Sequence, residues 1–509
     1  IKYRKYNTGI KYLYIKRVNM ADLQDDNIKN TLPPIRIAII PFLFLIGLMA
    51  ANLLVDTIEV PSEMVLFLST VIASLIAFFI LKIPYKKIEK GMLKSIDMAM
   101  HANLIMLLVG ALIAIWIASG IVPMLIYYGL ALISPKIFLT ICCMSCAIVA
   151  LCTGSSWSTI GTVGLALIGV GTVMGINPGL VAGAIISGAF FGDKMSPVSD
   201  TTNLAPAMVG TDVITHIKHM FFTSGPAIII SLCIYLVIDI FYSPPSMDKS
   251  QLENLQDLIC NHFNVSAWLL IVPVLVVTMV ARGLPAMPAL ILGIFLAVLA
   301  VPIFQWDYLI FALEGGVTFA NSYSLILNIL ASGFFIESGA VMTDQLFNRG
   351  GMASMMDILF LVFTAMTFGG VMEASGMLQS LAGATISKVK SIGGLVASTL
   401  ASCLFVNISA ANQTMAIIIP ARMFALTFKK FDLHPKNLSR VCEDSGTVTA
   451  PLIPWNTNAI FCTSALGVAT IDYLPFVFFA FISPLVSLYL AYTDKTMARI
   501  EEEPGFIIS

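Results

Sequence analysis

The chain has 509 residues, of which 58% are hydrophobic and only 11% are Asp, Glu, Lys or Arg, and its formal net charge is −1. Because an average soluble domain is roughly 25% charged, this composition excludes a soluble globular protein, and the near-zero charge excludes a basic nucleic-acid-binding protein. Apolar stretches of about 20 residues, each able to cross roughly 30 Å of hydrocarbon, and a mean hydropathy of +0.91 predict an all-α polytopic membrane protein.

Residues 1–34 form a polar, basic segment without the apolar core of a secretory signal peptide. The first methionine is Met20, so residues 1–19 are open to interpretation as an upstream extension that is not native, and we assign them no function. The nine cysteines lack the paired spacing of a secreted disulfide framework.

Flanking charges predict how the first half crosses the membrane. Lysine and arginine concentrate in cytoplasmic loops, which places the N-terminus inside and predicts three spans, at 35–55, 64–83 and 98–118. The second and third of these spans are joined by an expected cytoplasmic loop that carries Lys86, Lys87, Lys90 and Lys94.

Two interrupted segments follow the three spans. The apolar stretch 136–176 breaks at 153–158 without any charge, and we expect a hairpin that enters from outside and returns there. A helix at 178–210 breaks at 192–197. A span at 220–242 closes this first repeat, 35–242, and a polar external loop follows at 243–264.

The second half, 265–493, repeats this order upside down. It begins with three predicted spans, at 265–281, 286–304 and 317–336. We expect Arg349 in a cytoplasmic loop after them, and residues 353–387 as a hairpin or two short helices that begin and end inside.

A second hairpin, entered from the cytoplasm, is expected to break at 409–414. A second broken helix, 438–468, is interrupted at 443–447 and 451–456. A last span at 473–492 leads to a cytoplasmic tail, 494–509. The predicted fold is therefore two inverted-topology repeats, each with a re-entrant hairpin and a discontinuous transmembrane helix.

Paired interruptions in oppositely oriented halves indicate a secondary transporter. Irregular backbone at membrane depth persists only where protein or a water-filled cavity satisfies its polar groups. We therefore expect the four breaks to meet, with opened turns that offer carbonyl groups to cations and helix N-termini to anions.

Ion-binding candidates gather at the breaks of the first half. An ionised side chain at the bilayer centre costs at least about 2.5–3.5 kcal/mol, so acids between apolar helices need a role, and hard cations prefer oxygen ligands. We place Na⁺ at Asp193 and Asp200, with Lys194 as the charge partner that competes with Na⁺ for Asp193. The neighbouring oxygen ligands are Thr201, Thr202, Asn203 and, at the hairpin tip, Ser155 and Ser156.

The second half offers a matching set of acids, hydroxyls and amides around its breaks. An ordinary solvated turn after Lys436 and Arg440 is the alternative interpretation for its acidic part. The candidate residues here are Glu443, Asp444, Asn456 and Asn458 in the broken helix, and Asn412, Gln413 and Thr414 at the hairpin tip.

These motifs are similar to those of a known family. The eighteen-residue stretch 188–205, which reads GAFFGDKMSPVSDTTNLA, resembles the signature of the NhaC-type sodium/proton antiporters. Residues 154–159, 349–351 and 443–447 resemble other segments of that family, and the similarity extends from about 35 to 495.

The resemblance implies the ion-transporter superfamily fold, with inverted repeats and two re-entrant hairpins. It also implies an ion-binding role for Asp193 and Asp200, with Thr201, Thr202 and Asn203 beside them. The same family includes exchangers that couple sodium and protons to malate and lactate, and members that move amino acids.

We expect a secondary active antiporter of a bacterial cytoplasmic membrane that exchanges Na⁺ for H⁺ by alternating access, with both termini cytoplasmic. Its partners are Na⁺, H⁺ and the lipid bilayer, with a homodimer left open, no nucleic acid and no cofactor. The alternative cargo is a small organic anion or an amino acid. An intramembrane hydrolase is disfavoured because no histidine lies in any break, and buried acids fit coupled exchange better than a channel.

Overall fold

The computed structural model describes residues 32–54, 60–132, 135–241, 249–282, 284–314, 316–336, 344, 347–383 and 389–500. Helices make up these ranges, apart from turns and one isolated bridge between Leu433 and Arg499. Among the described residues, seven helices are long and apolar enough to cross a membrane, or up to nine if each bent pair is one span. The all-α polytopic membrane class is confirmed.

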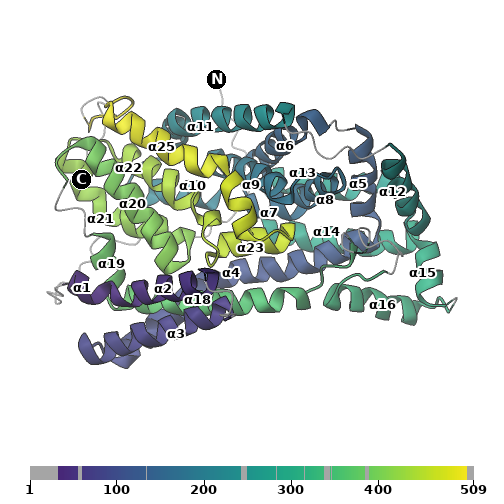
Figure 1. The fold of residues 1–509 in the computed structure, drawn as a ribbon, viewed down its shortest axis with the longest axis horizontal. Helices are drawn as coiled ribbons and strands as arrows, with labels where there is room; N and C mark the ends of the chain where they lie inside the picture. The colour runs from purple at the N-terminus through teal and green to yellow at the C-terminus, as the bar shows by residue number, and fades with distance from the viewer. Residues whose placement is uncertain are drawn as a thin grey trace, which may run out of the picture.

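One layer of the molecule consists of long helices that lie along its longest axis (Figure 1). It contains α2 (Ile40–Leu54), α3 (Ser62–Leu75), α4 (Tyr85–Ala118) and α18 (Met356–Ala374), and the short α1 (Ile35–Ala38) precedes it. Helices α4 and α18 run antiparallel: Gly91 of α4 packs on Gly370 near the end of α18, while Gly110 packs on Gly351, just before α18 begins. Close backbone approach through small residues is typical of helix packing in membranes.

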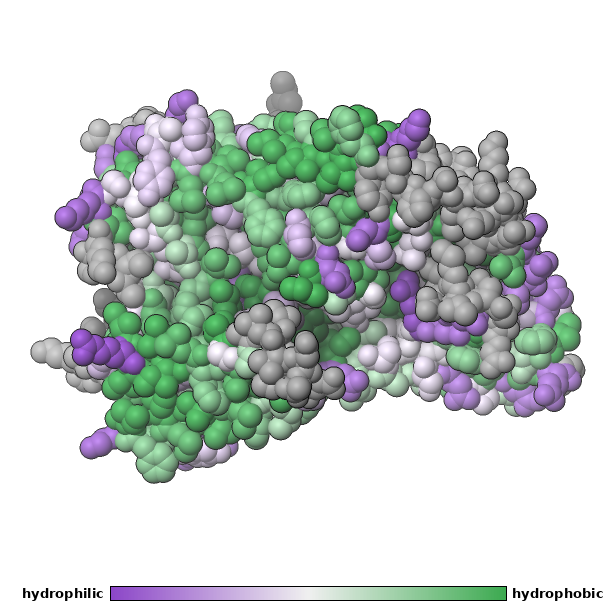
Figure 2. Space-filling view, viewed as in Figure 1, coloured by the Kyte–Doolittle hydropathy of each residue, from purple (hydrophilic) through white to green (hydrophobic). Residues whose placement is uncertain are grey.

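The surface of this layer is apolar. Figure 2 shows hydrophobic residues covering the lower left of the molecule, where Figure 1 places α2 and α3. Phe67, Phe78 and Phe79 are among the exposed side chains there. Water would disfavour such a surface, whereas lipid tails solvate it.

Two predictions for this layer are wrong. The basic stretch at 86–94 is not a loop, because α4 begins at Tyr85, directly after Pro84, and carries these lysines in its first turns. Residues 353–387 are not a hairpin or two short helices, because the 19-residue α18 precedes the short α19 (Met377–Ala382).

The segment before α18 also differs from the prediction. Helix α16 (Phe319–Ser332) has only 14 residues, shorter than the expected span at 317–336. It ends at Gly333, whose φ is +105°. Two later glycines, Gly350 and Gly351, also have positive φ, at +88° and +87°. The amide of Gly351 donates a 2.7 Å hydrogen bond to the Gly110 carbonyl oxygen. This glycine-rich turn, which contains Arg349, therefore packs against the middle of α4 instead of forming a free loop.

The predicted break at 153–158 is present. Helix α6 (Phe138–Thr153) ends at Gly154, whose φ is +66°, and the Ser155 hydroxyl caps the next helix, α7 (Ser156–Thr159), by accepting a bond from the Ser158 amide. A π-helical turn, Ile160–Gly164, leads into α8 (Leu165–Val173). A left-handed residue followed by a capping side chain is what a tight helix–helix turn requires.

The second hairpin has the same local construction. Helix α20 (Ile392–Ala410) ends at Ala411, whose φ is +53°, and the Asn412 side chain caps α21 (Gln413–Lys430) by accepting a bond from the Met415 amide. The break therefore lies within the predicted 409–414.

Broken helices follow both hairpins, as predicted. In the first half, α9 (Pro178–Met195) and α10 (Asp200–Val209) are separated by four residues. In the second half, α22 (Pro435–Cys442) continues as a π-helical segment, Glu443–Thr447, before α23 (Thr457–Leu466). The long closing helices are α11 (Val213–Phe241) and α25 (Phe478–Tyr492).

The remaining helices connect these units. They are α5 (Ile121–Leu132), α12 (Lys249–His262), α13 (Ile271–Ala281), α14 (Ala286–Phe304), α15 (Trp306–Ala312) and α24 (Thr470–Tyr473). The predicted external loop at 243–264 is thus mostly helical, in α12. The predicted N-terminal segment up to residue 31 and the predicted tail from residue 501 lie outside the described residues. Residues 496–500 pack on the start of α22, where the Asn437 side chain donates a hydrogen bond to the Ala498 carbonyl oxygen and accepts one from the Ala498 amide.

Candidate functional site

The two hairpin tips and the first broken helix surround one cavity of about 740 Å³. Helix α4 and the turn before α14 complete its wall, through His101, Ile105, Leu284 and Pro285 among others. The predicted site residues that line the cavity are Ser155, Ser156, Asp193, Asp200, Thr201, Asn412, Gln413, Thr414 and Asn458.

Each hairpin tip touches the broken helix of its own half. A side chain on Gly154 would meet the Ser199 amide nitrogen at 2.9 Å, within the break between α9 and α10. In the other half, the Thr457 amide donates a 3.1 Å hydrogen bond to the Ala411 carbonyl oxygen. The breaks therefore meet in pairs, each pair within its own half.

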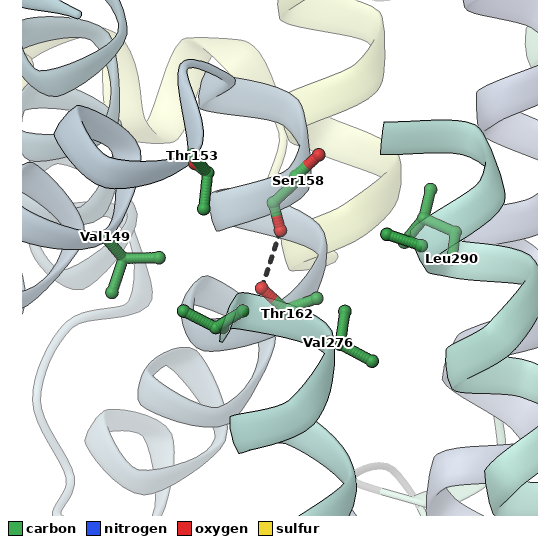
Figure 3. A pocket seen from close by; sticks show the side chains of 8 residues that line it. Val149, Thr153, Ser158, Thr162, Val276 and Leu290 are labelled. Carbon is green, nitrogen blue, oxygen red and sulfur yellow. Dashed lines mark hydrogen bonds between the residues drawn. The ribbon is translucent and has the colours of Figure 1, made fainter. Parts of the chain in front are cut away.

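A bend follows the first tip, beside a small cleft that shares Thr153 with the large cavity. This cleft has a volume of about 10 Å³. In Figure 3, Ser158 and Thr162 face Val276 of α13 and Leu290 of α14 across it. The Thr162 hydroxyl donates a 2.6 Å hydrogen bond to the Ser158 carbonyl oxygen, at the π-helical turn. Hydroxyl bonds of this kind bend helices, and π-helical turns often occur at functional sites.

Two acids contribute differently to the cavity wall. Asp193 is buried in the last turn of α9 and accepts a 2.7 Å hydrogen bond on Oδ2 from the Ser156 hydroxyl. Asp200 is exposed and begins α10, where a carboxylate is favoured by the helix dipole. One carboxylate is thus held in place by the hairpin, while the other is open to water.

Lys194 does not pair with Asp193, so that prediction is wrong. Its ammonium group lies 2.5 Å from Oδ1 of Asp444, and both side chains are completely buried. The same Oδ1 accepts hydrogen bonds from the hydroxyl groups of Thr223, at 2.8 Å, and Ser483, at 3.3 Å. The Lys side chain turns away because Asp193 and Lys194 are consecutive on α9, and adjacent helical residues do not face each other.

The acidic pair of the second half lies outside the cavity wall. Glu443 is fully buried and accepts a hydrogen bond from the Thr447 hydroxyl. Oε1 of Glu443 and Oδ2 of Asp444 have no hydrogen-bond partner among the described residues. Buried carboxylate oxygens without partners are unusual, and they mark this cluster as more than a solvated turn.

Three of the predicted residues hold the breaks in place without lining the cavity. Thr202 donates to the Lys194 carbonyl at 2.9 Å, and Asn203 donates to the Ser199 carbonyl at 2.7 Å. Asn456 donates to both oxygens of Asn407. The Thr202 and Asn456 contacts reach carbonyl groups in the last turns of α9 and α20, which a helix end leaves without an intrahelical partner. The Ser199 carbonyl also accepts a bond from the Asn203 amide.

Trp157 connects the two halves at the cavity. Its indole nitrogen donates a 2.8 Å hydrogen bond to Oδ1 of Asn458, and its ring stacks on Phe461 at 4.4 Å between centroids. Trp455, beside the opposite break, donates instead to the Ile408 carbonyl oxygen and does not line the cavity.

Residues 188–495, more than half of the chain, match the model of the Na⁺/H⁺ antiporter family. The chain belongs to this family. The family match begins on α9, five residues before Asp193, and runs to Lys495 after α25.

Relatives of this antiporter-family chain cover nearly all of its length. It is 36% identical over 452 residues to the Na⁺/H⁺ antiporter NhaC of Alkalihalophilus pseudofirmus, with 88% of this chain and 94% of the relative covered. It is 34% identical to the malate-2H⁺/Na⁺-lactate antiporter of Bacillus subtilis, covering 89% and 94%. It is 33% identical to the arginine/ornithine antiporter ArcD of Halobacterium salinarum, covering 81% and 83%.

Other polar contacts of this family member could not be found from the sequence. The hydroxyl groups of Thr223 on α11 and Ser483 on α25 donate hydrogen bonds to Asp444. In the sequence, both residues lie within apolar stretches that predict ordinary membrane spans. His216 and His219 bond Ser439 and Asn437, respectively. No group of three or more His, Cys, Asp or Glu residues that could hold a metal occurs among the described residues.

Proposed function

We propose that this protein is a secondary active transporter that exchanges Na⁺ for H⁺ across a bacterial cytoplasmic membrane by alternating access. The observation that carries the proposal is the convergence of both hairpin tips and the carboxylates of Asp193 and Asp200 on one cavity. The family membership and the NhaC relative support the same exchange.

The carboxylate of Asp193 performs the exchange in this proposal. A buried carboxylate is neutralised either by a proton or by a cation, so Na⁺ and H⁺ displace each other at Oδ1 and Oδ2. Oxygens of Ser156, Thr201 and Asn412 complete the coordination from the cavity wall, in line with the oxygen preference of hard cations. Asp200, at the open end of the site, attracts cations from water.

The inverted-repeat topology is part of the proposal. Matched construction of the hairpins at Gly154 and Ala411 supports it, because a repeat that recurs in the opposite orientation places both tips near the bilayer midplane. In this arrangement both hairpins are re-entrant and both termini are cytoplasmic.

A coupled organic solute is the second candidate. The cavity, at about 740 Å³, is far larger than one ion needs and lies within the range of about 300–1,000 Å³ typical of small-molecule sites. The Trp157 ring offers it a flat apolar wall. The malate/lactate and arginine/ornithine relatives favour the same alternative.

The experiment uses purified protein in sealed proteoliposomes with a trapped pH dye and an imposed pH gradient. Na⁺, Li⁺ or K⁺ is added alone, and then again with malate, lactate or an amino acid. Dissipation by Na⁺ alone that is lost in the D193N/D200N double variant supports cation/proton exchange. A proton flux that appears only when the organic solute is present would favour the second candidate, a coupled organic solute, over simple cation/proton exchange.

A further inference from the structure

The buried ion pair between Lys194 and Asp444 has the surroundings of a cation site. The ammonium nitrogen lies 2.5 Å from Asp444 Oδ1 and 3.3 Å from Ser483 Oγ. Thr223 contributes a further hydroxyl oxygen, 2.8 Å from the same Oδ1. The carboxylate oxygen that the ammonium group contacts is thus also held by hydroxyl groups of α11 and α25.

This arrangement is costly unless the positive charge has a function. Removing two ions from water is unfavourable, and their attraction compensates for this only with good geometry and additional hydrogen bonds. Here Oδ2 of Asp444 remains without a partner among the described residues, and so does Oε1 of Glu443, the adjacent residue. The Asp444 carboxylate therefore has one oxygen, Oδ2, that the ammonium group does not use.

The end of α9 adds to the negative potential. Lys194 is the last but one residue of this helix, and the carbonyl groups of a helix C-terminus carry a partial negative charge. Without the lysine, the pocket would contain the Asp444 carboxylate, two hydroxyl groups and a helix C-terminus, but no cation. A small monovalent cation suits this charge and these oxygens.

We propose that Lys194 is a tethered cation that occupies a second Na⁺ site, formed by Asp444, Thr223 and Ser483. Native protein then binds a single exchangeable Na⁺, at Asp193, because its own ammonium group permanently fills the other site. The inference rests on the proposed function for the identity of the ion. Removing the ammonium group opens the second site, with room for Na⁺ and water along the path of the lost side chain.

The test compares wild type, K194A and K194A/D444N as full-length proteins purified in detergent. Equilibrium binding of ²²Na⁺ gives the number of ions per chain, and thermal unfolding is followed against Na⁺ with N-methyl-D-glucamine holding the ionic strength constant. K194A is expected to bind one Na⁺ more than wild type, and its unfolding temperature is expected to rise with Na⁺. K194A/D444N, which lacks the carboxylate, is expected to lose both effects.

A matched control is K218A, which removes an exposed lysine from α11 and is expected to leave the number of bound ions unchanged. Equal Na⁺ binding by K194A and wild type overturns the inference. So does a K194A protein that cannot be recovered folded at any Na⁺ concentration while K194A/D444N folds.

Failure of the proposed function gives a different result. It appears as a wild-type protein that binds no Na⁺ and shows no Na⁺-driven proton flux. The comparison of K194A with K194A/D444N in Na⁺-dependent unfolding still decides the inference in that case.

Discussion

The Ser156 hydroxyl, at the tip of the first hairpin, donates a 2.7 Å hydrogen bond to Oδ2 of Asp193 in the last turn of α9. Both residues line the same cavity. This bond joins the hairpin to the broken helix. In the proposed exchange, an ion at Asp193 also binds the Ser156 oxygen, so ion binding would change how the hairpin tip is held.

Replacing Ser156 with alanine is expected to weaken Na⁺ binding without abolishing exchange. Loss of one hydrogen bond to a charged group costs about 1.5 kcal/mol, so the Na⁺ concentration for half-maximal exchange should rise about tenfold, with the maximal rate retained. The proteoliposome pH assay measures both quantities. S69A removes a buried hydroxyl that bonds only the Val65 carbonyl in α3. An equal shift in S69A and S156A would contradict the assigned role.

The two carboxylates of the cavity should differ in effect. D193N is expected to abolish Na⁺-driven proton flux, because an amide neither carries the proton nor neutralises the ion at the buried position. D200N is expected to raise the half-maximal Na⁺ concentration by about tenfold at most, since Asp200 is exposed and water screens its charge. A larger defect in D200N than in D193N would exchange their roles.

The helix breaks could be predicted because their cause is local. At Thr153 to Ser158, a glycine and three serines interrupt an apolar stretch, and such residues favour turns and caps over helix interiors. The structure places the break at Gly154 and Ser155. That both hairpin tips line one cavity agrees with the requirement that broken backbone at membrane depth be enclosed.

The errors have non-local causes. Lys194 was assigned to its neighbour Asp193, but its partner Asp444 is 250 positions away, and a contact at that separation leaves no pattern in one sequence. The sequence predicts Arg349 in a cytoplasmic loop, whereas the glycines that follow it turn against α4, because the Gly351 amide donates a hydrogen bond to the Gly110 carbonyl oxygen. The lysines at 86–94 lie outside the apolar stretch that follows them, but they belong to the same helix, α4, which begins before that stretch does.

Packing between α6 and α9 should tolerate no additional atoms at Gly192. A Cβ there would lie 2.6 Å from the Leu151 amide nitrogen, which is backbone and cannot move alone. G192A is therefore expected to destabilise the protein by about 1–3 kcal/mol, measured as a lower thermal unfolding temperature in detergent.

The matched control for this prediction is G47A. Gly47 lies in α2, and a Cβ at this position meets nothing within 4 Å. This variant should be neutral or more stable, because alanine favours a helix interior over glycine by about 1 kcal/mol. Equal loss of stability in G47A and G192A would show that the close contact is not the cause.

The bond between Trp157 and Asn458 should couple the first hairpin to α23 across the two halves. In the native protein the Trp157 ring stacks on Phe461 with 4.4 Å between ring centroids. W157F keeps an aromatic ring there but removes the indole N–H donor, which leaves Oδ1 of the buried Asn458 without that hydrogen bond. An unsatisfied buried acceptor costs about 1–3 kcal/mol, so W157F should lower the free energy of unfolding by that amount. The W157F, N458A and double variants form a cycle with an expected coupling energy of about 1 kcal/mol. W455F is the control, because the Trp455 indole donates to the Ile408 carbonyl oxygen and not to Asn458. A cycle of W455F with N458A should give a coupling energy near zero. Similar coupling energies in the two cycles would refute a specific link through Trp157.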